Sequence, residues 1–214
     1  MSEKFKNTYR TASARRQKWD YRWDASYFVT ICTKDRHHFF GEIIDGKMQL
    51  SHQGILANVF WHEIPHHAIS VHLDEFVVMP NHIHGILVLQ NGFPPPVYFE
   101  VFDFNSLWND GADNGRTGYG RDNACIVSTP TEMNNPEILT GKTRFQNPGK
   151  NSISSIIGSY KSAVTKHANR LNLENGWQTR FHDHIIRTKE EYYRIKKYIR
   201  NNTKNWEEDR FFEN

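Results

Sequence analysis

The chain has 214 residues, enough to bury the core of one domain, with or without an insertion. Aromatic residues make up 14% of it and charged residues 24%, which is typical of a folded protein and excludes a disordered one. No apolar run approaches the ~20 residues of a membrane-spanning helix, and the basic N-terminus does not resemble a secretory signal. Cys32 and Cys125 suggest neither a disulfide framework nor a zinc knuckle. These features predict a cytoplasmic protein with no membrane partner.

The basic residues are concentrated outside residues 91–140. That segment holds two arginines and seven acidic residues, so the rest of the chain has 25 basic and 17 acidic residues, a net charge of +8. Nucleic acid is therefore a credible partner, although an ordinary soluble protein with a basic surface would have the same balance. Residues 1–22 form a basic arm, which fits a phosphate-binding arm and a solvated tail equally well.

The first elements expected along the chain are a strand, a hairpin and a helix. Residues 27–33 are rich in β-branched and aromatic side chains and predict the strand. Residues 41–50 predict a short hairpin that turns at Asp45-Gly46. Ser51 is expected to cap a helix with apolar side chains at helical spacing, which ends at Pro65.

The second half predicts two more strands, a helix, an extended segment and a last helix, at residues 71–78, 82–89, 152–171, 177–186 and 190–202. Residues 90–150 are rich in Gly, Asn and Pro and predict an insertion or mobile loop. Antiparallel strands with helices packed on them make an α+β fold. We expect one domain over residues 23–206, interrupted by the insertion, between the basic arm and a tail at residues 207–214.

Two histidines open the strand at residues 82–89. The chain reads Met-Pro-Asn-His-Ile-His from Met79 to His84, so a tight turn leads directly into this strand. Side chains at positions i and i+2 of a strand point to the same face, so His82 and His84 lie side by side while Ile83 points into the core. This pair predicts a two-ligand metal site on a rigid sheet.

The last helix carries a second pair. Tyr198 and Asn202 are four residues apart and project together, beside the apolar stripe of Ile195 and Ile199. With His82, His84 and the Asn202 oxygen as ligands, Mg²⁺ or Mn²⁺ would polarise a phosphate while the Tyr198 hydroxyl attacks phosphorus. On such a helix, however, a tyrosine is more often an amphipathic packing residue.

These residues carry a family resemblance. The segment from Met79 to His84, with the apolar strand after it, and Tyr-Ile-Arg-Asn-Asn from Tyr198 to Asn202 resemble the HUH-type single-tyrosine transposases. Residues 176–187 and 198–206 resemble the REP-associated branch of that family. The resemblance covers residues 27–89 and 152–206, and the acidic insertion between them departs from the compact family pattern.

The resemblance implies a ferredoxin-like sheet, the HUH endonuclease fold, which binds single-stranded DNA near a foldback hairpin. His82 and His84 would be the metal pair, and Tyr198 would form a 5′-phosphotyrosine and release a 3′-hydroxyl. Asn202 falls where the insertion-sequence branch has a glutamine as its third ligand. That branch works as a dimer that exchanges its tyrosine helix, whereas the REP-associated branch resembles a monomer, so both states stay open.

Two further histidine patterns compete with this site. His182 and His184 form a second His-x-His pair, which could bind a metal, a phosphate or the sheet edge. Residues 62–66 match the zincin pattern His-Glu-x-x-His, but Pro65 breaks the helix that a zinc protease needs. We reject the protease interpretation and prefer the first histidine pair to the second as the metal site.

Basic and aromatic side chains near the last two helices could contact DNA. The candidates for phosphate contacts are Lys161, Lys166, Arg180, Arg187, Lys197 and Arg200. Tyr160, Trp177 and Phe181 could stack unpaired bases or, equally well, fill the core.

The sequence thus predicts a metal-dependent endonuclease and strand transferase, a transposase that cleaves single-stranded DNA near a hairpin. The alternative is a catalytically inactive or domesticated hairpin-DNA-binding protein with the same fold. A metal hydrolase of small substrates is a third possibility, and its activity would not depend on Tyr198.

Overall fold

The computed structural model describes residues 4–5, 8–9, 16, 18–68, 70–109 and 150–212. Most of the predicted insertion, including Cys125, lies outside this range. Within the described helices, none combines the length and the apolarity that crossing a membrane requires. Strands β1 (Lys4–Phe5) and β2 (Thr8–Tyr9) pair within the predicted basic arm. Trp19, which the sequence also assigns to this arm, is instead buried, and its indole nitrogen donates to the hydroxyl of Tyr27.

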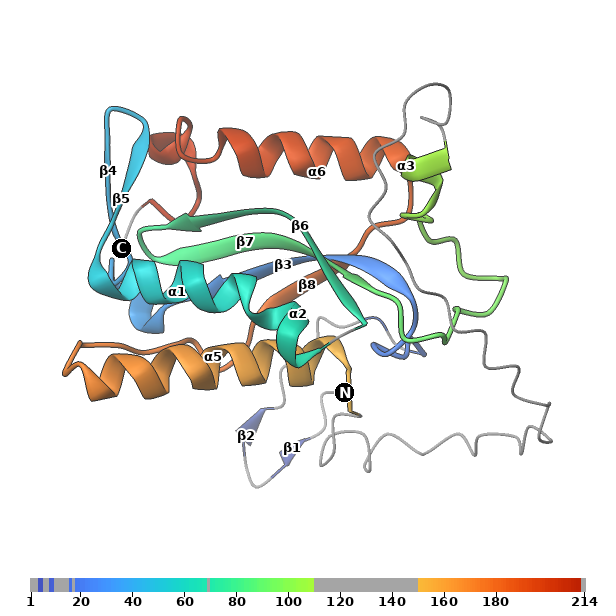
Figure 1. The fold of residues 1–214 in the computed structure, drawn as a ribbon, viewed down its shortest axis with the longest axis horizontal. Coiled ribbons are helices and arrows are strands. Elements are labelled where there is room, and N and C mark those ends of the chain that lie inside the picture. Colours follow the sequence, from blue (N-terminus) through green and yellow to red (C-terminus); the bar gives the residue numbers. More distant parts are fainter. Residues whose placement is uncertain are drawn as a thin grey trace.

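A four-stranded sheet forms the centre of the domain (Figure 1). Its strands are β3 (Ala25–Cys32), β6 (Val71–Met79), β7 (His82–Leu89) and β8 (His182–Ile185). They lie in the order β6-β7-β3-β8, and every neighbouring pair is antiparallel. The strands predicted at residues 27–33, 71–78 and 82–89 are confirmed, and the extended segment at residues 177–186 contains β8.

Helices cover both faces of this sheet (Figure 1). Helices α1 (His52–His62), α2 (Ile64–His67) and α5 (Ile153–Arg170) lie on one side, and α6 (Lys189–Asn201) lies on the other. The order β3-α1-β6-β7-α5-β8 is the ferredoxin-like βαββαβ arrangement, which confirms the predicted fold class. The smaller elements are η1 (Lys34–Arg36), β4 (Gly41–Ile44), β5 (Lys47–Leu50), α3 (Ser106–Asn109) and η2 (Trp206–Glu208).

A capping side chain starts helix α1 where the sequence predicts it. The Ser51 hydroxyl accepts from the backbone N–H of Gly54 at the start of α1, as expected. The zincin pattern is divided between two helices, because His62 ends α1 and His66 belongs to α2. This break supports the rejection of the zinc-protease interpretation.

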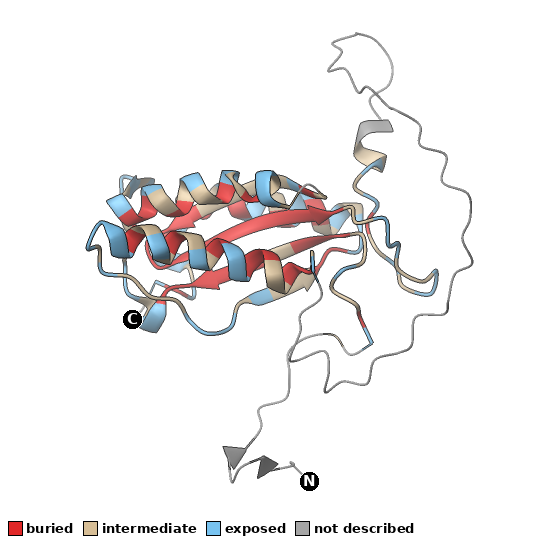
Figure 2. Ribbon diagram, turned by 60° about the horizontal axis from the view of Figure 1, so that its bottom comes forward, coloured by how far each residue is buried: buried red, intermediate tan, exposed pale blue. Residues whose placement is uncertain are grey.

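The side chains of each central strand alternate between two hydrophobic clusters. On β3, Tyr27, Val29 and Ile31 pack against α1 and α5, whereas Phe28 and Cys32 face the side of α6. Figure 2 shows the result as a buried central sheet between helices whose outer faces are exposed. The sheet is therefore packed on both faces, and the side chains of β7 are buried along its whole length.

Gly85 follows the histidine pair and lets a tryptophan approach the sheet. A Cβ atom at this position would overlap the indole ring of Trp61, which is fully buried and stacks on Phe76 with ring centroids 5.5 Å apart. Since a buried ring cannot move aside, the close packing of α1 on the sheet requires glycine here.

We expect Gly85→Ala to lower the free energy of unfolding by about 2–3 kcal/mol through overpacking. Gly158→Ala is the matched control, because on the exposed side of α5 the added Cβ has no described atom within 4 Å other than those of its chain neighbours and its own helix backbone. That change should be neutral or stabilise the protein by up to about 1 kcal/mol. Urea denaturation of both variants checks the prediction, and equal stabilities would contradict it.

Candidate active site

The sheet brings His82 and His84 together on the face that α6 covers. Their ring centroids are 4.4 Å apart, and both side chains are buried. In the neighbouring strand, Thr30 lies opposite His84 and Cys32 lies opposite His82. Ile83 points into the opposite cluster, so the predicted alternation along β7 is confirmed.

Each imidazole is held through its Nδ1 atom. Nδ1 of His84 lies 2.9 Å from the Thr30 hydroxyl, and Nδ1 of His82 lies 2.8 Å from Oδ1 of Asn81. Because Asn81 donates through Nδ2 to the carbonyl of Phe211, its Oδ1 is the acceptor, and His82 carries its hydrogen on Nδ1. Nε2 of His82 therefore carries no hydrogen and has a free lone pair. This atom is buried and has no hydrogen-bond partner among the described residues.

Helix α6 brings Tyr198 and Asn202 to the same place. The Tyr198 hydroxyl lies 3.1 Å from Nε2 of His84, and the phenol ring remains 43% exposed. Asn202 is buried at the end of the helix, and its Oδ1 has no hydrogen-bond partner within the described range. The i, i+4 pairing inferred from the sequence thus unites the tyrosine and the amide beside the two histidines.

Ion pairs on β6 hold α6 against the sheet. Asp74 accepts hydrogen bonds from the Tyr192 hydroxyl at 2.5 Å and from Nζ of Lys196 at 2.7 Å. One turn further along, the Arg200 guanidinium pairs with Glu75 at 2.5 Å. These contacts lie on both sides of Tyr198 along the helix, so they position its hydroxyl within the same chain as the histidines.

One residue of the site, Asp209, is not indicated by any pattern in the sequence. Its Oδ2 accepts hydrogen bonds from the Tyr198 hydroxyl at 3.2 Å and from Nδ2 of Asn202 at 3.0 Å. Ligand atoms of His82, His84 and Asp209 all lie within 4.8 Å of one another, an arrangement that could hold a metal ion. Asp209 follows η2 in the segment that the sequence assigns to a tail, and no spacing relates it to the histidines.

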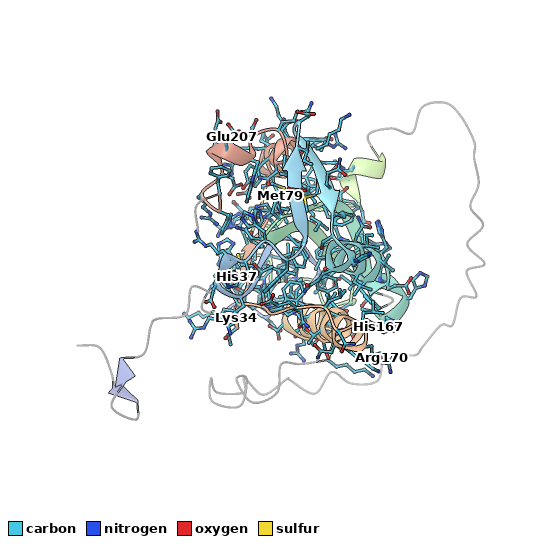
Figure 3. The ribbon with its side chains drawn as sticks, turned by 90° about the vertical axis from the view of Figure 1, so that its left-hand side faces the viewer. Lys34, His37, Met79, His167, Arg170 and Glu207 are labelled. Atoms are coloured by element: carbon cyan, nitrogen blue, oxygen red, sulfur yellow. The ribbon has the colours of Figure 1, made fainter. Side chains whose placement is uncertain are left out.

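The same C-terminal segment covers the imidazoles. The Phe211 ring centroid lies 4.6 Å from that of His82 and 6.0 Å from that of His84. Trp206 packs beside them with Met79 and Cys32. Figure 3 places Glu207 of this segment on the opposite side of the molecule from His167 and Arg170 of α5. The site is therefore built from the sheet, α6 and the C-terminal segment.

Burial determines the ionisation of the site. It lowers the pKa of His82 to about 3, with Arg210 and Arg36 contributing, and it lowers the pKa of His84, with His82 contributing. Both imidazoles are consequently neutral at pH 7, the form that binds metals. Burial, with the Asp209 carboxylate contributing, raises the pKa of the Tyr198 hydroxyl to about 12.

The buried histidines predict a pH-dependent stability of the metal-free protein. Their pKa values are lower in the folded than in the unfolded state, so the stabilisation is complete above pH 6.5 and is lost as the pH falls towards 3. Each histidine adds a slope of up to about 1.4 kcal/mol per pH unit. Thermal unfolding in EDTA between pH 7 and pH 5 measures this slope. His82→Gln should flatten it, whereas His66→Gln, an exposed control, should not.

The donor set fits a divalent ion. Nε2 of His82 and Oδ1 of Asn202 are buried polar atoms that otherwise leave hydrogen bonds unmade, at a free-energy cost of about 1–3 kcal/mol each. Two imidazole nitrogens with amide and carboxylate oxygens match Mn²⁺ or Mg²⁺ better than a thiolate-preferring metal. The side-chain amide oxygen Oδ1 of Asn81 and the hydroxyl of Thr30 orient the two rings.

Two substitutions separate the roles of the oxygen donors. Asn202→Ala should weaken Mn²⁺ binding by about 10–100-fold, because it removes a buried oxygen and the amide that orients Asp209. Asp209→Asn should reduce tyrosine reactivity more than Mn²⁺ affinity, since its carboxylate already accepts the Tyr198 hydroxyl. Calorimetric Mn²⁺ titration measures the affinity of both variants, and the rate of covalent adduct formation with DNA measures the reactivity of Tyr198. Unchanged Mn²⁺ binding by Asn202→Ala would contradict the prediction.

The residues predicted to contact phosphate are not all at this site. Lys161 and Lys166 belong to α5, and Nζ of Lys161 donates to the carbonyl of Gln178. Arg200 pairs with Glu75, while the remaining three side chains, those of Arg180, Arg187 and Lys197, are exposed. Of the residues that could stack bases or fill the core, Tyr160 is buried and donates to the carbonyl of Ala57, so the core alternative is the one observed for it.

The second histidine pair lies on the edge strand β8. His184 pairs with Glu191 of α6 at 2.8 Å rather than with a cluster of metal ligands. In the described part of the chain, His82, His84 and Asp209 form the one group of three or more such residues close enough to hold a metal. This finding supports the preference for the first pair.

Comparisons with known proteins gave three findings. No family model matches the chain. A solved structure of a REP-associated tyrosine transposase bound to a REP hairpin is similar with a TM-score of 0.44 and 17% identity, covering 91% of this chain and 74% of that one. An uncharacterized protein of Haemophilus influenzae is 31% identical over 202 residues, which cover 94% of this chain and 92% of the relative. The chain belongs to the same protein family as this Haemophilus influenzae protein.

Proposed function

We propose that the protein is a metal-dependent endonuclease and strand transferase of single-stranded DNA that acts through Tyr198. The observation that carries the proposal is the position of the Tyr198 hydroxyl, 3.1 Å from Nε2 of a buried neutral histidine that is paired with a second one. A tyrosine that only packed the core would not be half-exposed beside two buried atoms, Nε2 of His82 and Oδ1 of Asn202, that have no hydrogen-bond partner among the described residues. This arrangement supports nucleophilic catalysis rather than a packing role.

In the proposed cleavage step, Tyr198 supplies the attacking oxygen and Asp209 accepts the proton. The Tyr198 oxygen attacks phosphorus, a P–O bond to the tyrosine forms, and the bond from phosphorus to the 3′ oxygen breaks. The phenolic proton passes to Oδ2 of Asp209, which already accepts that hydrogen, and Asp209 then releases it to solvent. The departing 3′ oxygen takes up one proton from solvent, so no net proton is gained or lost. Attack by the 3′-hydroxyl of another strand on the phosphotyrosine reverses these steps and gives strand transfer.

His82, His84 and Asn202 would hold the divalent ion, with Asp209 beside them. When bound, the ion supplies Lewis-acid polarisation of the scissile phosphate. The ligands themselves are fixed before the substrate arrives, because Thr30, Asn81 and the sheet orient the rings.

Hairpin DNA as the substrate rests on the resemblance of residues 79–84 and 198–206 to HUH-type transposases and on the basic body of the chain. Asp74 and Glu75 of the sheet pair with α6, which supports a reaction in which the tyrosine and the histidines of one chain act together.

A covalent-adduct assay tests the proposal. The protein is incubated with hairpin single strands labelled at either end, with Mn²⁺ or with EDTA, and separated on a denaturing gel. In the samples with Mn²⁺, but not in those with EDTA, we expect a more slowly migrating protein band. This band should carry the DNA fragment whose 5′ phosphate was at the cut. Tight, salt-sensitive binding without an adduct across a panel of hairpins would instead identify the inactive DNA-binding protein, and cleavage without an adduct would identify a metal hydrolase.

A further inference from the structure

The second His-x-His pair lines an open pocket next to the nucleophile. This pocket has a volume of about 380 Å³ and lies between β3, β8 and α6, with Phe28, His182, His184, Glu191, Arg194 and Tyr198 in its wall. In the sheet register Thr30 lies opposite both His84 and His182, and Phe28 lies opposite His184. Both histidine pairs therefore occupy the same face of the sheet.

We infer that this pocket binds one unpaired nucleobase of the DNA strand that Tyr198 cleaves. The inference rests on the proposed function, because the pocket shares Tyr198 with the reaction site. When Tyr198 attacks the scissile phosphate, the base of an adjacent nucleotide lies within one nucleotide length of the tyrosine. The pocket lies within that distance, because Tyr198 itself lines it, and it offers both an aromatic side chain and polar groups.

The chemistry of the wall favours a base over a phosphate. The Phe28 ring supplies an apolar surface, with its centroid 5.2 Å from that of His84 and 6.3 Å from that of Tyr198. The Glu191 carboxylate also lines the pocket and would repel an anion. Any of the four bases can stack on an aromatic ring, whereas a phosphate gains no binding energy from an aromatic surface.

The polar groups of the pocket are arranged to meet the edge of a base. Glu191 accepts from the backbone N–H of Arg187 at 2.9 Å and pairs with His184 at 2.8 Å, which fixes the His184 ring. The guanidinium of Arg194 lies 3.6 Å from the same carboxylate, and its side chain is 77% exposed, so most of its N–H donors face solvent. His182 is exposed beside them. Arg194 and His182 are thus the groups that would read the base.

The inference is tested by combining abasic sites in the DNA with substitutions in the full-length protein. Single abasic sites are introduced one by one along the single-stranded flank of a labelled hairpin, and binding is measured by fluorescence anisotropy in EDTA, where cleavage cannot interfere. We expect one abasic position to weaken binding by the wild-type protein roughly tenfold. The same abasic site should have a clearly smaller effect on the double variant with His182→Ala and Arg194→Ala, which keeps the Phe28 wall but loses the groups that contact the edge of the base.

The control is Lys197→Ala, which removes an exposed positive charge from α6 outside the pocket wall. It should weaken all DNAs alike and keep the tenfold abasic effect. An equal abasic effect in wild type and double variant, the absence of any sensitive position, or the absence of DNA binding would overturn the inference. Adduct formation in Mn²⁺ is scored separately. If an adduct forms but the abasic effect is the same in wild type and double variant, only the pocket inference is refuted. If the abasic effect depends on the pocket residues but no adduct forms, only the catalytic proposal is refuted.

Discussion

Tyr198→Phe is expected to abolish the covalent protein–DNA adduct and to reduce strand cleavage by at least about 10³-fold, because it removes the attacking oxygen itself. DNA affinity should stay within about twofold of wild type, since the phenyl ring keeps its packing against Phe28 and His84. Gel analysis of labelled hairpin strands measures cleavage, and anisotropy in EDTA measures affinity.

Tyr193→Phe is the matched control for this substitution. Tyr193 is 51% exposed on the same helix, but its ring contacts Tyr192 and it does not line the pocket beside the histidines. It should cleave at the wild-type rate. Residual adduct in Tyr198→Phe, or equal losses in both variants, would show that Tyr198 is not the nucleophile.

His82→Ala is expected to have the second large effect, on metal binding. The Nε2 atom of His82 is a buried, unprotonated nitrogen that would ligate the metal. Its removal should weaken Mn²⁺ binding by at least about 100-fold. A ligand that binds only the folded state at 100 times its Kd stabilises it by about 2.7 kcal/mol. Thermal unfolding with and without Mn²⁺ should therefore show a clear rise in Tm for the wild type and none for His82→Ala.

His184→Ala tests whether the second pair contributes to metal binding. His184 pairs with Glu191 at the strand edge and lies outside the cluster of candidate ligands. We expect this variant to keep the full rise in Tm on addition of Mn²⁺. Loss of that rise in His184→Ala but not in His82→Ala would move the metal site to β8.

Local patterns in the sequence were sufficient to predict much of the fold and half of the candidate site. The alternation through His82, Ile83 and His84 predicts which side chains share a face, because the period of a strand is fixed by its backbone. The helical spacing of Tyr198 and Asn202 predicts their pairing for the same reason. Both are short-range properties that need no knowledge of the rest of the chain.

The remainder depends on tertiary contacts that no spacing encodes. Asp209 reaches the tyrosine only because η2 turns the chain back after Trp206, which packs with Met79. Thr30 is selected by the register between β3 and β7, which are more than 50 residues apart. Tyr160 was equally compatible with base stacking and with the core until the position of α5 was known.

The most direct test of the account is mass-spectrometric mapping of the covalent adduct. Trypsin cleavage after Lys197 and Arg200 isolates Tyr198 in a tripeptide, separate from the peptide that carries Tyr192 and Tyr193. After the DNA is digested to a single nucleotide, we predict that the added nucleotide mass is found on the Tyr198 peptide, in samples with Mn²⁺ alone. Nucleotide mass on the peptide of Tyr192 and Tyr193, or on a histidine, would contradict the assignment of Tyr198 as the nucleophile.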